Sequence, residues 1–124
     1  MESNEKENKN GAEGGGYGER TEEIVINQLA DLFAAISNPI RLMILYALRE
    51  KDDNTMEWQE IQRMTGTTAG ALKFHMDKIG AFNLVEKYSG KYRITTKGIG
   101  LLYLIDELKN KVEKIVRVEL ELFS

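Results

Sequence analysis

Apolar side chains recur along this chain mostly every three or four residues, the spacing that gathers them on one face of a helix. The first such series runs from Thr21 to about Ser37, so we predict a helix there with Thr21 as its N-cap. Residues 1–20 are rich in Glu, Asn, Lys and Gly and nearly lack large apolar side chains. Such a segment buries too little surface to offset its ordering entropy, so we expect a disordered acidic and Gly-rich tail.

A second helix is predicted directly after the first. Asn38 is a good N-cap, and Pro39 suits the first helical position, where its missing N–H costs nothing. The helix is expected to end near Lys51, before a polar loop. Its predicted inner face consists of Ile40, Met43, Ile44, Ala47 and Leu48.

A short strand and a short helix are predicted next. The strand covers residues 55–58 and places Met56 and Trp58 on one side. The helix covers residues 59–64, and Gly66 follows it as a C-terminal breaker. The expected buried side chains of this helix are Ile61 and Met64.

The next predicted helix, about 67–80, has two different faces. Thr67 or Thr68 caps its N-terminus. The apolar face, at helical spacing, consists of Leu72, Met76 and Ile79. The opposite face consists of Ala69, Gly70, Lys73 and Asp77, with Phe74 near its edge.

Residues 84–95 predict a β-hairpin. Two strands, 84–88 and 91–95, flank the dipeptide Ser89-Gly90, which is typical of a two-residue turn. This register places Val85 opposite Ile94 on one face and Glu86 opposite Arg93 on the other, an apolar pair and an ion pair.

A long helix is predicted from Thr96 onward. Its apolar positions alternate spacings of four and three, as in the seam of a coiled coil: Leu101, Ile105, Leu108, Val112 and Ile115. Glu119 then falls where the seam needs an apolar residue. Residues 116–122 also alternate with period two, so a strand stays possible for 116–124, although we favour a helix.

The elements predict a mainly α fold with a small β-wing, namely a winged helix-turn-helix with a long C-terminal dimerisation helix. Its expected parts are the tail (1–20), a DNA-binding domain (21–98) and the dimerisation helix (99–124). The chain has no cysteine, which excludes disulfides and thiolate metal sites. No signal peptide is apparent, and the longest nearly apolar run, 99–105, is too short for a bilayer, so we expect a soluble, cytoplasmic protein without membrane contact.

The distribution of charge favours a nucleic-acid partner although the net charge is −3. Residues 1–23 carry seven acidic and three basic side chains, so the acidic excess lies in the tail. Residues 58–98 carry seven basic and three acidic side chains, a local excess of +4 that suits a phosphate-binding surface.

We therefore predict double-stranded DNA as the partner. A recognition helix at about 67–80 would present small and polar residues to base edges in the major groove, and the wing at about 85–95 would lie on the backbone or minor groove. That helix has no Arg, Asn or Gln, the strongest base readers, so only modest base specificity is expected. The predicted DNA-binding residues are Thr67, Thr68, Ala69, Gly70, Lys73, Phe74, Lys78, Lys87, Tyr88, Lys91 and Arg93.

Two alternatives stay open: a low-specificity, nucleoid-like DNA binder, and a winged helix that binds protein instead of DNA. An enzyme is not expected, because no phosphate loop, nucleophile arrangement or paired His–carboxylate set is present. His75 is the only histidine, so we expect no metal site and no cofactor, and a structural role for this side chain.

Several segments in order resemble the ArsR-like winged-helix transcriptional regulators. They are Ala34–Leu48 for the opening helices, Trp58–Ile79 with His75-Met76 for the helix-turn-helix, and Tyr92–Gly98 for the strand entering the last helix. The resemblance spans about residues 29–105.

The resemblance implies a homodimer that reads a pseudo-palindrome with half-sites about 34 Å apart. The metal-sensing Cys and His clusters of that family are absent, and Lys73 stands where the family often has Ser. With the first and last helices at the interface, the predicted dimer contacts are Leu29, Phe33, Leu101, Ile105, Leu108, Val112 and Ile115.

Overall fold

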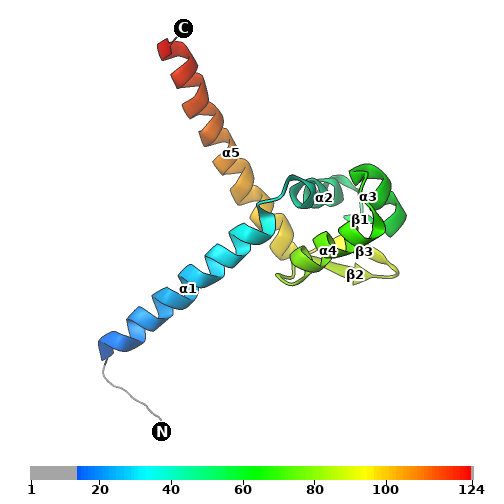
Figure 1. Ribbon diagram of the computed structural model, residues 1–124, viewed down its shortest axis with the longest axis horizontal. Helices are drawn as coiled ribbons and strands as arrows, with labels where there is room; N and C mark the ends of the chain where they lie inside the picture. Colours follow the sequence, from blue (N-terminus) through cyan, green and yellow to red (C-terminus); the bar gives the residue numbers. More distant parts are fainter. Residues whose placement is uncertain (1–13, 124) are drawn as a thin grey trace. The chain divides into compact units, whose positions relative to one another are not determined.

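The computed structural model describes residues 14–123, with side chains described from Arg20 onward. The chain divides into two compact units, one ending at Ala35 and the other beginning at Ile36. The described part is mainly helical with a small three-stranded antiparallel sheet (Figure 1). Its elements are α1 (Gly14–Ile36), α2 (Pro39–Glu50), β1 (Thr55–Met56), α3 (Trp58–Thr65), α4 (Ala69–Gly80), β2 (Val85–Tyr88), β3 (Lys91–Ile94) and α5 (Thr96–Phe123).

Helix α1 begins earlier than predicted. It starts at Gly14, so Thr21 lies inside the helix and is not its N-cap. Extending an existing helix by a few residues costs far less than nucleating one, which allows the glycine-rich sequence to join it. The rest of the predicted disordered tail, residues 1–13, lies outside the described residues.

Helix α2 confirms the predicted cap and corrects the predicted inner face. The Asn38 side chain accepts a hydrogen bond of 2.8 Å from the backbone N–H of Ile40, and Pro39 is the first helical residue. Met43 is 43 % exposed, so its predicted burial is wrong. Ile44 and Leu48 of the predicted face are buried, while Ile40 and Ala47 are half-buried. The buried stripe also contains Arg41 and Leu45, so it is turned slightly from the predicted one.

The predicted strand at 55–58 is shorter in the structure. β1 contains only Thr55 and Met56, which pair with Arg93 and Tyr92 of β3. Trp58 is the first residue of α3, so the prediction that it shares a strand face with Met56 is wrong. The pairing with β3 covers only two residues, and the chain turns into a helix as soon as that pairing ends.

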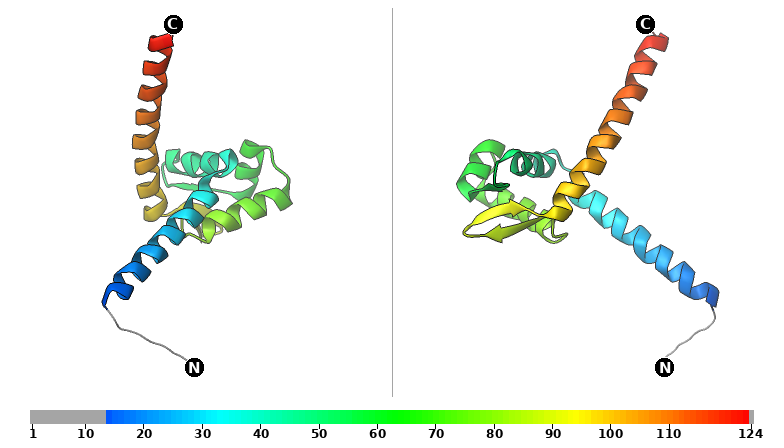
Figure 2. Two further views of the ribbon diagram at one scale, coloured as in Figure 1. Left: turned by 60° about the vertical axis from the view of Figure 1, so that its left-hand side comes forward. Right: turned by 180° about the vertical axis from the view of Figure 1, so that it is seen from behind.

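The sheet and α4 follow the sequence closely. The strand order is β1-β3-β2, and Val85 faces Ile94 while Glu86 faces Arg93, as predicted. The helix buries its three predicted residues, Leu72, Met76 and Ile79. Helix α4 and the β2–β3 hairpin lie side by side, which places the two predicted DNA-contacting elements next to each other (Figures 1 and 2).

The first turn of α5 is fixed to the hairpin. The Thr95 hydroxyl donates a hydrogen bond of 2.6 Å to the backbone oxygen of Asn83 and accepts one of 3.0 Å from the N–H of Gly98. Leu102, one turn later, is fully buried. The beginning of α5 therefore belongs to the core, together with the buried side chains of Ile44, Leu45, Leu48, Ile61, Leu72, Ile79 and Leu84.

Beyond residue 106 every described side chain of α5 is exposed. The helix continues through Phe123, so residues 116–123 are helical and the alternative of a terminal strand is wrong. None of the described helices is by itself long and apolar enough to cross a membrane.

Candidate nucleic-acid interface

A tight turn between α3 and α4 presents the N-terminus of α4. Gly66 adopts a left-handed conformation with φ of 67°, and its N–H donates a hydrogen bond of 2.9 Å to the oxygen of Gln62, ending α3. The hydroxyls of Thr65 and Thr67 lie 3.0 Å apart and share a hydrogen bond. The turn is thus fixed by its own contacts, and Thr67 contributes to them.

Thr68 is the N-cap of α4, one of the two predicted possibilities. Its hydroxyl oxygen accepts a hydrogen bond of 3.1 Å from the backbone N–H of Ala71. A hydroxyl that accepts one bond still has a donor and a second acceptor position. The predicted base-contacting hydroxyls of Thr67 and Thr68 therefore already make hydrogen bonds within the protein, which limits the directions in which they can point.

The face of α4 opposite the core is exposed along its length. Its first turn carries only Ala69 and Gly70 and leaves the backbone open to a close approach. Further along, the Phe74 ring is 55 % exposed, and the Lys78 ammonium lies 5.2 Å from its centre. An exposed aromatic ring beside a cation suits contact with a base or a sugar.

Lys73 is paired within the helix. Its ammonium lies 2.8 Å from a carboxylate oxygen of Asp77, one turn away. The pKa of Lys73 is raised, mainly by that hydrogen bond and by the charge of Asp77. Both side chains are largely exposed, so solvent screens the pair and a phosphate can replace the carboxylate.

The hairpin turns sharply at Ser89 and Gly90, whose φ angles are 51° and 78°. Two successive positive φ angles are those of a type I′ turn, the usual two-residue hairpin connection. The strands separate the predicted contact residues between two faces. Tyr88, Lys91 and Arg93 lie on one face, and Lys87 lies on the other beside Tyr92.

Arg93 is the most strongly engaged of the predicted contacts. Its guanidinium donates hydrogen bonds of 2.6 and 3.1 Å to one oxygen of Glu86 and stacks 3.8 Å from the centre of the Tyr88 ring. These contacts, led by the hydrogen bond to Glu86, raise its pKa. A DNA phosphate would have to compete with Glu86 for Arg93, whereas Lys87 and Lys91 have no carboxylate within ion-pair distance among the described side chains.

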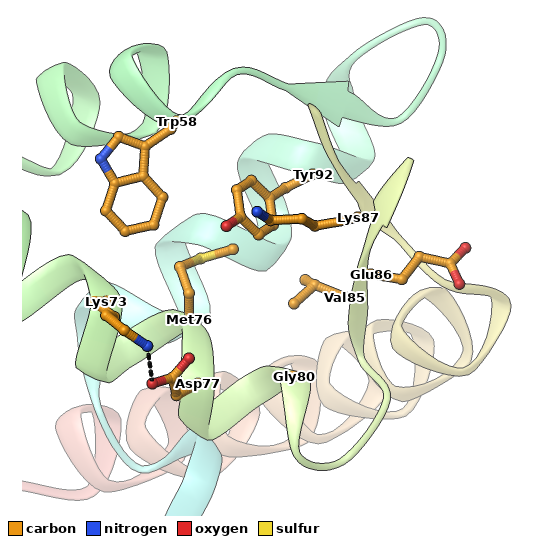
Figure 3. A pocket seen from close by; sticks show the side chains of 9 residues that line it. All are labelled: Trp58, Lys73, Met76, Asp77, Gly80, Val85, Glu86, Lys87 and Tyr92. Carbon is orange, nitrogen blue, oxygen red and sulfur yellow. Dashed lines mark hydrogen bonds and ion pairs between the residues drawn. The ribbon is translucent and has the colours of Figure 1, made fainter. Parts of the chain in front are cut away.

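A groove of about 670 Å³ separates α4 from the hairpin (Figure 3). The Trp58 and Tyr92 rings lie on it, with centres 5.9 Å apart, and the Lys87 ammonium lies 5.5 Å from the Tyr92 ring. Both aromatic side chains are half-buried, and together they form the wall of the groove. The groove is lined by Trp58, Lys73, Met76, Asp77, Gly80, Val85, Glu86, Lys87 and Tyr92.

His75 has a structural partner, in line with its expected role. Its Nδ1 lies 3.1 Å from a guanidinium nitrogen of Arg41, a largely buried side chain of α2. A guanidinium only donates, so Nδ1 accepts and the ring is neutral with its proton on Nε2. Burial and then the positive charge of Arg41 lower the pKa of His75.

A polar cluster joining α2 to α5 has no signal in the sequence. The Tyr46 hydroxyl and the Arg49 guanidinium donate hydrogen bonds of 2.8 and 2.9 Å to the two oxygens of Asp106. Arg49 also lies 5.0 Å from the Tyr46 ring and 5.9 Å from the Tyr103 ring. The partners are far apart in the chain, so no local spacing indicates the cluster.

The predicted dimer contacts on α5 are exposed or half-buried. Leu101 and Ile105 are half-buried near the core, while Leu108, Val112 and Ile115 are exposed. On α1, the predicted contacts Leu29 and Phe33 are likewise exposed. Among the described residues, much of the predicted interface is thus left uncovered.

A family model described as "Domain of unknown function (DUF7347)" matches residues 29–105, which is more than half of the chain. The searches of curated proteins and of solved structures gave no match.

Proposed function

The chain belongs to the DUF7347 family, and we propose that it binds double-stranded DNA as a homodimeric transcriptional regulator of the winged-helix type. In this proposal α4 enters the major groove, and the β2–β3 hairpin is the wing on the neighbouring backbone. The observation that carries the proposal is the exposed first turn of α4, made of small residues, beside a hairpin with exposed or half-exposed lysines.

Lysines on both elements supply the proposed phosphate contacts. Lys73 and Lys78 project from α4, and Lys87 and Lys91 from the hairpin. Lys73 and Lys87 line opposite sides of the groove, so both can reach one strand of the DNA backbone lying along it. The pairing of Arg93 with Glu86 makes Arg93 a weaker candidate than these lysines.

The base readout in this proposal is modest. The start of α4 and the turn before it offer Thr67, Thr68, Ala69 and Gly70, which provide hydroxyl, methyl and backbone contacts but no bidentate donor. Specificity then comes mainly from DNA shape and from water-mediated contacts. The alternative of a low-specificity, nucleoid-like DNA binder is compatible with this proposal. Equal affinity for promoter DNA and random DNA would support that alternative.

The test is a fluorescence-anisotropy titration of the full chain with duplex DNA over a range of salt concentrations. We expect affinity to fall steeply with salt, and Lys87→Ala or Lys91→Ala to reduce the slope of log K against log salt by about 1 each. Lys114→Ala, on the outer half of α5, is the matched control and should leave the slope unchanged. Absence of binding to any duplex at micromolar protein, or a flat salt dependence, would refute DNA binding.

A second candidate function is a protein-interaction module, which the groove itself favours. Two cations and two anions line the groove around aromatic side chains, so its formal charge is zero. Aromatic side chains such as Trp58 and Tyr92 are enriched in protein interfaces, and a groove without net charge has no preference for a polyanion. If this alternative holds, combining Lys78→Ala, Lys91→Ala and Arg93→Ala, none of which lines the groove, should leave cellular function intact, whereas Trp58→Ala in the groove wall should abolish it.

A further inference from the structure

Glu119 interrupts the exposed apolar stripe on the outer half of α5. The stripe contains Leu108, Val112, Ile115 and Leu122, all exposed in the chain. Along the helix, Glu119 lies between Ile115 and Leu122. At 100° per residue its direction differs by only about 20° from that of Leu108, so it lies within the stripe. Any partner that covers the stripe also covers this carboxylate.

Within residues 14–123, no cation lies beside Glu119 on α5. The positions three and four residues away on the helix are Ile115, Val116, Leu122 and Phe123, all apolar. None of the ion pairs among the described side chains involves Glu119. A carboxylate that enters an apolar interface without a cation is strongly disfavoured, so a suitable partner has to bring the cation.

The same helix carries two lysines at the edges of the stripe. Lys109 and Lys111 lie on either side of Leu108, and both are exposed. In the helical projection they flank the stripe, with Lys109 about 100° from Leu108 on one side and Lys111 about 60° from it on the other. If a partner helix packs on Leu108, these two lysines flank the contact.

We propose that α5 pairs with α5 of a second copy in antiparallel orientation, with Glu119 over Leu108 of the partner subunit and between Lys109 and Lys111 of the partner subunit. The pairing is reciprocal, as a two-fold axis requires, and each copy supplies the cations for the other's carboxylate. In this register the seam contacts are Val112 with Ile115 of the partner subunit, Ile105 with Leu122 of the partner subunit, and Leu108 with Glu119 of the partner subunit.

A parallel arrangement is excluded by the same charges. In-register parallel helices place each seam residue opposite its own copy, so the two Glu119 carboxylates would meet inside the apolar interface. Lys109 and Lys111 would then lie more than a helical turn away from both of them. The charge pattern thus selects one orientation and one register, and the inference rests on the homodimer proposed above.

The first test is a charge exchange read by sedimentation equilibrium of the full chain. We expect Glu119→Lys to weaken dimerisation at least tenfold, Lys109→Glu with Lys111→Glu to do the same, and the triple variant to recover most of the affinity. Glu121→Lys and Lys114→Glu make the same charge changes on the opposite face of α5 and should leave the affinity unchanged. Circular dichroism checks that each variant keeps its helix content.

The second test reads the orientation from introduced cysteines, since the natural chain has none. Leu122→Cys alone should not cross-link to itself, because antiparallel helices hold the two positions about 25 Å apart along the axis. A mixture of Leu122→Cys and Ile105→Cys chains should form the mixed disulfide under mild oxidation, since these positions face each other.

The outcomes separate the two proposals. A natural chain that is monomeric at all accessible concentrations would refute both the homodimer and this pairing. A natural dimer that survives Glu119→Lys unchanged, or that cross-links through Leu122→Cys alone, would refute the antiparallel pairing and leave the homodimer standing.

Discussion

The two halves of α5 show how one helix can serve two environments. The first turns carry Gly98 and Leu102, both buried, and Asp106, which is bonded to α2. The outer half has a similar apolar content, but none of the described elements covers it, and Leu108 is 60 % exposed while Leu102 is fully buried. The helical spacing of apolar residues is the same in both halves. This spacing predicts that one face of the helix is buried, but it does not indicate which element covers that face.

The largest expected contrast is between a core leucine and an outer-half leucine. Leu72→Ala should lower the free energy of unfolding by about 2–5 kcal/mol, because it empties a fully buried site. Leu108→Ala should change it by no more than about 0.5 kcal/mol in dilute, monomeric protein. Urea unfolding at low protein concentration measures both, and similar losses for the two variants would contradict the contrast.

Two glycines in the first turns of α5 give a sharper comparison. A Cβ on Gly98 would lie 2.5 Å from the backbone oxygen of Leu84 and 2.7 Å from Cγ1 of Ile94, so Gly98→Ala should cost about 1–3 kcal/mol. At Gly100 nothing lies within 4 Å of the added Cβ, and Gly100→Ala should gain about 0.5–1 kcal/mol of helix stability. In thermal unfolding, the melting temperature should fall for Gly98→Ala and rise for Gly100→Ala.

The Asp106 cluster should make the joint between α2 and α5 acid-sensitive. Hydrogen bonds from Arg49 and then Tyr46 lower the pKa of Asp106 below its ordinary value of 3.8. A depressed carboxyl pKa contributes stability above the ordinary value and loses it as the pH falls through the folded-state pKa. Asp106→Asn should therefore lower the melting temperature at pH 7. In strong acid the melting temperatures of the variant and of the natural chain should become more similar.

The matched control for this joint is Glu107→Gln, which removes a neighbouring exposed carboxylate. It should leave the melting temperature at pH 7 unchanged. If Asp106→Asn also leaves that temperature unchanged, the joint does not depend on the cluster.

The smallest expected effect belongs to His75. Its pKa is lowered from 6.5 by burial and by Arg41, so the unfolded chain takes up a proton first as the pH falls. Stability should then decline as the pH drops below 6.5, and His75→Gln should flatten this decline because glutamine can still accept from Arg41. Since the chain has only one histidine, a decline that persists between pH 6.5 and 5.5 in His75→Gln would rule out this origin.

Local chemistry in the sequence predicted much of the fold. The Asn38-Pro39 start of α2, the Gly66 end of α3 and the Ser89-Gly90 turn each need a particular residue type, so they are visible in the chain. The hairpin register followed from alternation and from the length of that turn. Errors arose where a local pattern is compatible with two structures, as at Trp58, which suits a strand as well as a helix start.

The candidate site was only partly predictable. The sequence indicated which residues α4 and the hairpin carry, but the pairing of Lys73 with Asp77 and the stacking of Arg93 on Tyr88 depend on rotamers. Alternation along the strands already separates Lys87 from Lys91, but which of the two faces lies against α4 depends on tertiary packing. The groove wall formed by Trp58 and Tyr92 joins residues far apart in the chain, which spacing along the sequence cannot indicate.

The way α5 starts has a mechanical consequence. Thr95 and Gly98 fasten its first turn to the hairpin, and the helix then runs 28 residues, about 42 Å, without a break. The part beyond Asp106, about 25 Å long, acts as a lever arm, because a change of about 10° in its direction moves the tip by about 4 Å. Through this lever, a force applied near Phe123 is converted into a turning moment on the hairpin at the other end.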